Sequence, residues 1–150
     1  MRTPHQTLQI FLDEVAGAVL RQDFAAYRER IALPFQVVTH TASLQIDNDH
    51  NLRQRFDTYA QALRVQRITD WLRLVEGAEE LDEALITGRY VTHMMAGAHR
   101  VMPPFRSQIT LRREDGRWRA ASVTNAHATS RRSLIVPVVF PTEAAKGPLR

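Results

Sequence analysis

The sequence predicts an α+β fold in which three N-terminal helices pack on an antiparallel sheet built by the second half of the chain. Apolar residues recur at helical spacing between Leu8 and Leu20, which predicts an amphipathic helix. Apolar and polar residues alternate in long runs between Ile68 and His127, which predicts strands. Asp115-Gly116 separates two of these runs, and this dipeptide strongly favours a two-residue hairpin turn because both positions tolerate positive φ.

The first helix begins with the segment Thr3-Pro4-His5-Gln6. Thr3 suits the N-cap, the proline suits the first helical position, and the glutamine completes a capping box. The apolar stripe of this helix consists of Leu8, Phe11, Leu12, Val15 and Val19. We expect Asp23 to cap a second, shorter helix that ends at Pro34. Its inward side chains are predicted to be Phe24, Tyr27 and Ile31.

The next segment, residues 35–46, is typical of β structure and predicts two short strands bent around Thr41-Ala42. The acidic and amide residues of Asp47-Asn48-Asp49 indicate a turn followed by a helix cap. A third helix follows, with the apolar stripe Leu52, Phe56, Tyr59 and Leu63. Residues 68–80 predict a long strand that turns at Asp82-Glu83 into the next one.

Two turns set the expected register of the last strands. The Asp115-Gly116 turn places Leu111 opposite Ala120 and Ser107 opposite Thr124. A two-residue turn at Gly97-Ala98 places Phe105 opposite Tyr90. The predicted apolar face then carries Ile86, Tyr90, Met94, Phe105, Ser107, Ile109, Leu111, Ala120, Ser122 and Thr124. The predicted polar face carries Thr87, Arg89, His93, Arg106, Gln108, Arg112, Arg119, Asn125 and His127.

A chain of 150 residues is expected to form one domain, which we place at residues 1–128. Residues 129–150 form a C-terminal extension with an apolar run, Leu134 to Phe140, that Pro137 interrupts. We expect this run to pack on the domain or on a partner subunit. The chain has no cysteine, which excludes disulfides and thiolate chemistry. It has no long apolar run and no signal-peptide pattern, so we expect a cytoplasmic protein without a membrane span.

The net charge is +4, and Lys146 is the only lysine among the 20 basic residues. The arginines are dispersed and mixed with acids, as in Arg112-Arg113-Glu114-Asp115. Nucleic-acid binding calls for a basic stripe with interleaved aromatic residues. We therefore expect no nucleic-acid partner.

The order of elements, the long first helix with its short successor, and the final hairpin around Asp115 to Arg119 together resemble the nuclear-transport-factor-2-like (NTF2-like) superfamily, also called SnoaL-like or ketosteroid-isomerase-like. The similarity covers about residues 8–127. It implies a strongly curved, cone-shaped sheet wrapped around the helices, with a pocket inside, and we expect a homodimer through the outer face of the sheet. Proteins of this superfamily include isomerases, cyclases and non-catalytic binding modules, so the resemblance does not select a reaction.

The predicted pocket is lined by aromatic and hydroxyl side chains from the inward stripes and the apolar face. These are Tyr27, Tyr59, Trp71, Tyr90, Phe105, Ser107 and Thr124. They favour a small apolar ligand, and an acidic one if Arg73 shares the face of Tyr90.

An isomerase of this superfamily implies a carboxylate base facing a tyrosine. The predicted apolar face of the last three strands holds no acidic residue, so we consider Asp70 or His40 as the base in an isomerase- or cyclase-like proton transfer. The alternatives are a strand-end acid and a surface histidine without a catalytic role. A further alternative is a non-catalytic interaction module, or a small accessory subunit such as that of a dioxygenase, that binds a partner near Arg89 and Arg106.

The sequence contains no nucleotide-binding glycine motif, no nucleophile elbow and no histidine spacing typical of metal sites. We therefore expect neither a cofactor nor a metal ion.

Overall fold

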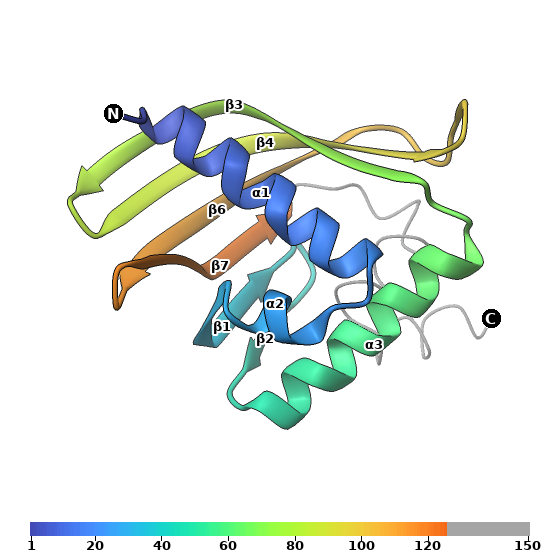
Figure 1. Ribbon diagram of the computed structural model, residues 1–150, viewed down its shortest axis with the longest axis horizontal. Coiled ribbons are helices and arrows are strands. Elements are labelled where there is room, and N and C mark those ends of the chain that lie inside the picture. Colours follow the sequence, from blue (N-terminus) through green and yellow to red (C-terminus); the bar gives the residue numbers. More distant parts are fainter. Residues whose placement is uncertain (126–150) are drawn as a thin grey trace.

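The computed structural model describes residues 1–125 and shows a mixed α+β domain (Figure 1). Its elements are α1 (Pro4–Leu20), α2 (Phe24–Arg28), β1 (Ile31–Val38), β2 (Ser43–Ile46), α3 (Asp49–Val65), β3 (Asp70–Asp82), β4 (Leu85–Ala96), β5 (His99–Arg100), β6 (Phe105–Glu114) and β7 (Arg117–Asn125). The predicted extension at 129–150 and the last three residues of the predicted domain lie outside the described residues.

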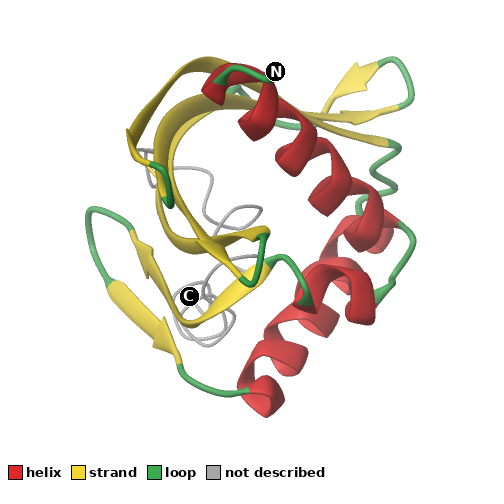
Figure 2. Ribbon diagram, turned by 60° about the vertical axis from the view of Figure 1, so that its left-hand side comes forward, coloured by secondary structure: helices red, strands yellow, loops and turns green. Residues whose placement is uncertain are grey.

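The sheet has the strand order β2-β1-β7-β6-β4-β3, and the short β5 pairs with β4. It curves strongly, and α1, α2 and α3 lie on its concave side (Figure 2). This arrangement confirms the predicted fold class of a curved sheet over N-terminal helices. One pairing differs from the expectation, because β1 runs parallel to β7 while the other paired strands are antiparallel. A long crossover, which includes most of the chain, connects these two parallel strands.

The capping box at the start of α1 is formed as predicted. The Thr3 backbone N–H donates to Gln6 Oε1 at 2.9 Å, and the Gln6 backbone N–H donates to Thr3 Oγ1 at 3.1 Å. Every residue of the predicted apolar stripe of α1 is buried. The helix therefore contributes one full face to the core.

The end of α2 was predicted wrongly. Asp23 caps this helix by accepting a hydrogen bond from Ala26 N at 3.1 Å, but the helix ends at Arg28. Ile31 begins β1, and Pro34 lies inside that strand after a cis peptide bond. A proline is tolerated there because its missing N–H costs no hydrogen bond at a break in the ladder, and the β1·β7 register shifts between Ile31 and Gln36.

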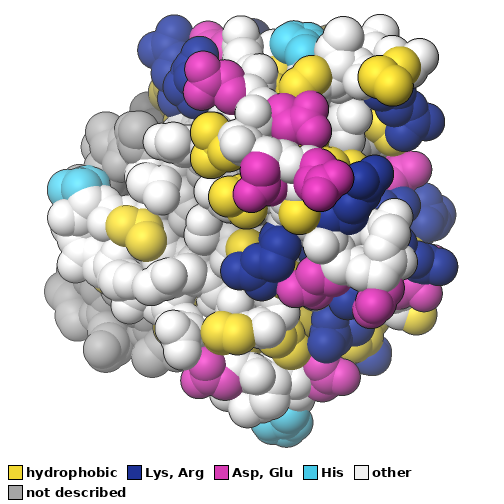
Figure 3. All heavy atoms as spheres, turned by 90° about the vertical axis from the view of Figure 1, so that its left-hand side faces the viewer, with side chains coloured by type: hydrophobic (Ala, Val, Ile, Leu, Met, Phe, Trp, Pro, Cys, Tyr) yellow, Lys and Arg dark blue, Asp and Glu magenta, His cyan; other side chains and the backbone are white. Residues whose placement is uncertain are grey.

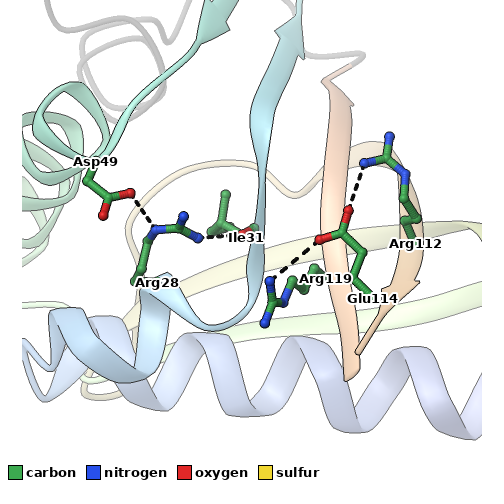
Figure 4. Close-up of polar contacts among 6 residues, drawn as sticks. All are labelled: Arg28, Ile31, Asp49, Arg112, Glu114 and Arg119. Carbon is green, nitrogen blue, oxygen red and sulfur yellow. Dashed lines mark hydrogen bonds and ion pairs between the residues drawn. The ribbon is translucent and has the colours of Figure 1, made fainter. Parts of the chain in front are cut away.

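The third helix begins at the predicted cap, where Asn48 Oδ1 accepts a hydrogen bond from Asn51 N at 2.8 Å. Arg28 ties the ends of three elements together (Figure 4). Its Nε lies 2.6 Å from Asp49 Oδ1 at the start of α3, and its Nη1 donates to Ile31 O at 2.9 Å at the start of β1. This arginine therefore fixes how the helices meet the sheet.

Helix α1 lies directly across β3 and β4. The Gln9 side chain donates from Nε2 to Arg73 O at 2.7 Å and accepts from Val75 N at 2.9 Å through Oε1. Gly88 on β4 permits the close approach, because a Cβ there would lie 2.4 Å from Leu8 Cδ2. These contacts position the middle of α1 over the concave face.

Two register predictions need correction. Beyond residues 101–104, β6 pairs with β4 so that Tyr90 faces Ser107 and Thr92 faces Phe105. The shift relative to the predicted pairing is two residues, which leaves each side chain on its expected face. The segment between β5 and β6, residues 101–104, contains Pro103-Pro104. Prolines lack the backbone N–H that a strand ladder needs.

The β6–β7 hairpin follows the prediction near its turn and departs from it further along. Leu111 faces Ala120 as expected, and Glu114 accepts hydrogen bonds from Arg112 and Arg119 beside the turn (Figure 4). The register then shifts between Thr110 and Leu111, which exchanges the faces of the remaining residues of β7.

Candidate functional site

A cavity of about 120 Å³ lies between the helices and the concave face of the sheet. Helices α1, α2 and α3 line it together with every strand of the main sheet path. Its lining residues are Phe11, Val15, Tyr27, Ile31, Phe35, Val37, Ile46, Arg55, Tyr59, Trp71, Arg73, Tyr90, Thr92, Met94, Phe105, Ser107, Ile109, Ala120, Val123 and Asn125.

Six of the seven side chains expected at the pocket line this one cavity, namely Tyr27, Tyr59, Trp71, Tyr90, Phe105 and Ser107. Thr124 does not, because it is exposed on the other face of β7. The register shift in β7 turns Asn125 inward in its place. Asn125, which was expected on the polar face, is 6% exposed, and its Oδ1 accepts a hydrogen bond from Ser107 Oγ at 2.5 Å.

Neither residue considered as a base lies at the cavity. His40 is exposed in the turn between β1 and β2, outside the strand in which it was expected. Asp70 is exposed at the start of β3, where its Oδ2 accepts a hydrogen bond from Thr69 Oγ1 at 3.0 Å. The structure therefore brings neither side chain near the tyrosines that line the cavity.

Aromatic rings form one wall of the cavity. Tyr59 on α3 and Trp71 on β3 pack edge to face, with ring centroids 5.0 Å apart and an angle of 67° between the planes. Tyr27 on α2 packs against Phe56 at a centroid distance of 5.0 Å. Such pairs contribute stability beyond the area that they bury, so this wall is stiff.

Two tyrosines at the cavity, Tyr27 and Tyr59, remain protonated at neutral pH. Burial raises the pKa of Tyr27 to about 12, although the positive charge of Arg73 acts in the opposite direction. Burial also raises the pKa of Tyr59 well above its ordinary value. Both phenols are therefore neutral hydrogen-bonding groups rather than anions.

Arg73 brings a positive charge to the cavity from β3. Its side chain is on the concave face with Trp71 and Tyr90, and the residue is 8% exposed. The guanidinium carbon lies 4.0 Å from the Trp71 ring centroid and 5.7 Å from that of Tyr90. Nη2 donates to Leu12 O at 3.0 Å, whereas the buried Nε has no hydrogen-bond partner among the described residues.

Arg55 on α3 is a second cationic lining residue, and the sequence analysis did not select it. It is half-buried, and burial lowers its pKa, but an arginine remains charged in proteins. The sequence feature that could have identified Arg55 is its position four residues before Tyr59, because this spacing places both side chains on the same side of a helix.

Comparison with known proteins connects this geometry to one fold. No family model matches the chain, and no curated protein matches it in sequence. A domain of unknown function with a cystatin-like fold from Nostoc punctiforme superposes with a TM-score of 0.64 at 13% identity, covering 98% of this chain and 93% of its own. An NTF2-like protein with a cystatin-like fold from Novosphingobium aromaticivorans gives 0.61 at 14% identity, with coverage of 91% and 90%. The chain has the NTF2-like fold.

A third NTF2-like structure, a protein of unknown function from Shewanella oneidensis, has a TM-score of 0.61 at 11% identity and covers 83% of this chain and 100% of its own. Identities this low establish the shared fold and carry no function with them. What this NTF2-like cone does must therefore be argued from its own cavity.

The cavity of this NTF2-like domain offers little acid–base chemistry. None of its lining residues within the described chain is aspartate, glutamate or histidine. No group of acidic and histidine side chains in residues 1–125 is arranged to hold a metal ion. The polar lining groups are tyrosines, arginines, Thr92, Ser107 and Asn125, which are hydrogen-bond donors or acceptors.

Outside the cavity, charges of both signs are intermixed. Figure 3 shows basic and acidic side chains side by side on the face that it presents. Surface ion pairs of this kind include Arg106 Nε with Glu76 Oε1 at 3.0 Å and Arg117 Nη1 with Glu29 Oε1 at 2.6 Å. No helix in the described part of the chain is long and apolar enough to cross a membrane.

Proposed function

We propose that this protein binds a small, mainly apolar molecule inside the cone. The observation that carries the proposal is the cavity of about 120 Å³, lined by aromatic and aliphatic side chains from all three helices and the concave sheet face. A concave, mainly apolar site with a few inward polar groups is the usual form of a small-molecule site. The chain resembles the NTF2-like superfamily, whose cone-shaped fold encloses a pocket, and this resemblance agrees with the proposal.

The size of the cavity limits the ligand. A buried water needs about 10–15 Å³ of such volume, so 120 Å³ accommodates roughly ten non-hydrogen atoms. This suits a single ring with a short substituent, or a short branched chain. The Ser107–Asn125 pair and the tyrosine hydroxyls are the groups available to orient a polar substituent.

The proposal assigns binding and no proton-transfer step. A general base must come within hydrogen-bond reach of the proton that it removes, directly or through one water. His40 and Asp70 are exposed and absent from the cavity lining. Burial raises the pKa values of Tyr27 and Tyr59, so these two phenols stay protonated near neutral pH and do not serve as proton acceptors there.

A cavity-filling variant tests the proposal. Ala120→Leu adds volume inside the cavity, because Ala120 is a buried lining residue of β7. We expect this variant to weaken the binding of the neutral probe 2-phenylethanol at least tenfold, measured by NMR titration of the backbone amides. The probe is expected to shift the amides of lining residues in the unaltered protein.

Thr124→Leu is the matched control, because it introduces the same side chain in the same strand at an exposed position. It should bind the probe as the unaltered protein does. Equal binding by both variants, or a probe that shifts only amides away from the cavity lining, would refute the proposed binding site.

A second candidate function is association through the convex face of the sheet, with a second copy of this chain as the partner. It is favoured by Leu72 and Leu74, which are 46% and 51% exposed although they alternate with the buried Trp71 and Arg73. The replacement of both leucines by serine is expected to convert a dimer into a monomer in sedimentation analysis. An unaltered protein that sediments as a monomer at all concentrations tested would reject this candidate.

The cationic patch proposed from the sequence for such a partner is smaller than expected. Arg106 forms an ion pair with Glu76, with Nε and Oε1 3.0 Å apart, and it lies opposite Val91. Arg89 lies opposite Gln108, so the expected cross-strand pair of Arg89 with Arg106 does not form. The apolar side chains on this face, rather than its charges, therefore support the association.

A further inference from the structure

The strongest unexplained feature of the molecule is the buried charge of Arg73. Within residues 1–125 it forms no ion pair, and its Nε has no hydrogen-bond partner although the atom is buried. Burying a charge is costly unless it is paired, and a buried N–H without an acceptor adds to that cost. The surroundings of Arg73 within the described chain therefore leave a cost that a bound anion would offset.

The neighbouring groups satisfy Arg73 only in part. The guanidinium carbon lies over two aromatic rings, 4.0 Å from the Trp71 centroid and 5.7 Å from the Tyr90 centroid. One edge donates through Nη2 to Leu12 O at 3.0 Å. Cation–π contacts and one carbonyl offset part of the desolvation cost, but they supply no negative charge and no acceptor for Nε.

No side chain at the cavity supplies the missing anion. The described lining contains no carboxylate, and the two tyrosines with raised pKa values are neutral at pH 7. Arg55 adds a second positive charge, and it too has no hydrogen bond or ion pair within the described chain. The cavity is therefore electropositive and at the same time largely apolar.

We propose that the ligand of this cavity is a small apolar carboxylate whose carboxylate group pairs with Arg73. This inference rests on the proposed function and specifies its ligand class. A planar carboxylate matches the edge of a guanidinium, with its two oxygens accepting parallel N–H bonds. Nε, which has no acceptor among the described residues, is the donor that such a carboxylate would satisfy, and the aromatic side chains of the lining would contact the apolar body of the ligand.

The same features discriminate against other ligand classes. A cationic ligand would place a like charge beside Arg73 and Arg55 in a poorly solvated site. A phosphate ester carries more charge and more acceptor oxygens than a carboxylate, and a cavity dominated by apolar side chains suits the smaller polar group better. A neutral apolar molecule fits the volume but leaves Arg73 unpaired.

The test uses two probes of nearly the same shape and size, phenylacetate and 2-phenylacetamide, which differ in charge. Their dissociation constants are measured at neutral pH by isothermal titration calorimetry or NMR titration with the full chain. A charge-assisted hydrogen bond contributes about 1.5–3 kcal/mol, which corresponds to a preference for phenylacetate of roughly tenfold to a hundredfold. We expect the acid to bind more tightly by this factor.

Arg73→Met removes the charge and keeps an unbranched side chain at this position. We expect its preference for phenylacetate over the amide to fall to about one, with amide binding retained. Arg89→Met is the matched control, because Arg89 is an exposed arginine on the neighbouring strand and does not line the cavity. It should keep the full preference. If the Arg73 variant does not fold, the comparison of the two probes on the unaltered protein still decides whether the cavity prefers a carboxylate.

The outcomes separate this inference from the proposed function. Equal binding of acid and amide, or a preference that Arg73→Met leaves unchanged, would overturn the carboxylate inference and leave a neutral-ligand cavity in place. If neither these probes nor 2-phenylethanol binds, both proposals are wrong.

Discussion

Replacement of Leu12 by alanine is expected to lower the free energy of unfolding by about 2–5 kcal/mol. Leu12 is 0% exposed in the middle of α1, where the helix packs on the concave face of the sheet. Alanine is an excellent helix former, so the loss comes from missing contacts and the cavity left behind rather than from the helix itself. Chemical denaturation monitored by circular dichroism measures the effect.

Val65→Ala provides the control within another helix. Val65 is 67% exposed at the end of α3, so its replacement removes little packing and gains helix propensity. We expect its free energy of unfolding to stay within about 0.5 kcal/mol of the original. A Leu12→Ala protein as stable as the Val65 variant would contradict the described packing of α1.

The protein is expected to lose stability at alkaline pH, between about pH 10 and pH 12. Burial raises the folded-state pKa of Tyr27 from its ordinary value of 10.0 to about 12, so the folded chain retains a proton that the unfolded chain has lost. The stabilisation is complete below pH 10 and falls as the pH rises towards 12. The difference between the folded-state and unfolded-state pKa values of Tyr27 corresponds to roughly 3 kcal/mol of unfolding free energy. Tyr59 contributes in the same direction because its pKa is also raised.

Tyr27→Phe separates this contribution from general alkaline denaturation. Phenylalanine keeps the ring that packs against Phe56 and removes the ionisable hydroxyl. The free energy of unfolding of the variant, measured from pH 8 to pH 12, should fall less steeply than that of the unaltered protein. Identical slopes for the two proteins would show that Tyr27 does not titrate within the buried site.

Most of the architecture was predictable because local signals agreed with the tertiary structure. The capping box at Thr3, the Asn48 cap and the Asp115-Gly116 turn are short-range features that the chain settles within a few residues. The parallel pairing of β1 with β7 was not predicted. No local pattern specifies which distant strands pair, and this pairing joins elements from opposite ends of the described chain.

The faces of the strands show where prediction from spacing fails. The Gly97-Ala98 turn forms as expected, but the excursion through residues 101–104 moves the pairing by two, which preserves the faces. The irregularity in β7 moves the β6–β7 pairing by one residue, so Asn125 rather than Thr124 faces the cavity. A bulge has no sequence signature comparable to a turn, so the alternation pattern alone led to the wrong residue.

The candidate site was predictable where aromatic residues fell on inward stripes, as for Tyr27 and Trp71. The proposed bases were misplaced because short apolar segments do not reveal where a strand stops. His40 follows the apolar end of β1, yet the strand ends at Val38. The role of Arg73 depends on what surrounds it. Its missing counter-ion becomes visible only when the neighbouring elements are in place.

The two hydrogen bonds of Gln9 also affect whether a second copy of this protein pairs with the edge strand β3. β3 is the last strand of the sheet, and an open edge strand is a template on which another chain adds by backbone pairing. The Gln9 amide occupies Arg73 O and Val75 N on that edge, as a neighbouring strand would. The second half of β3 carries Glu79, Glu80 and Asp82, whose charges oppose the approach of an identical strand. Both features disfavour the addition of another copy at the β3 edge of the sheet.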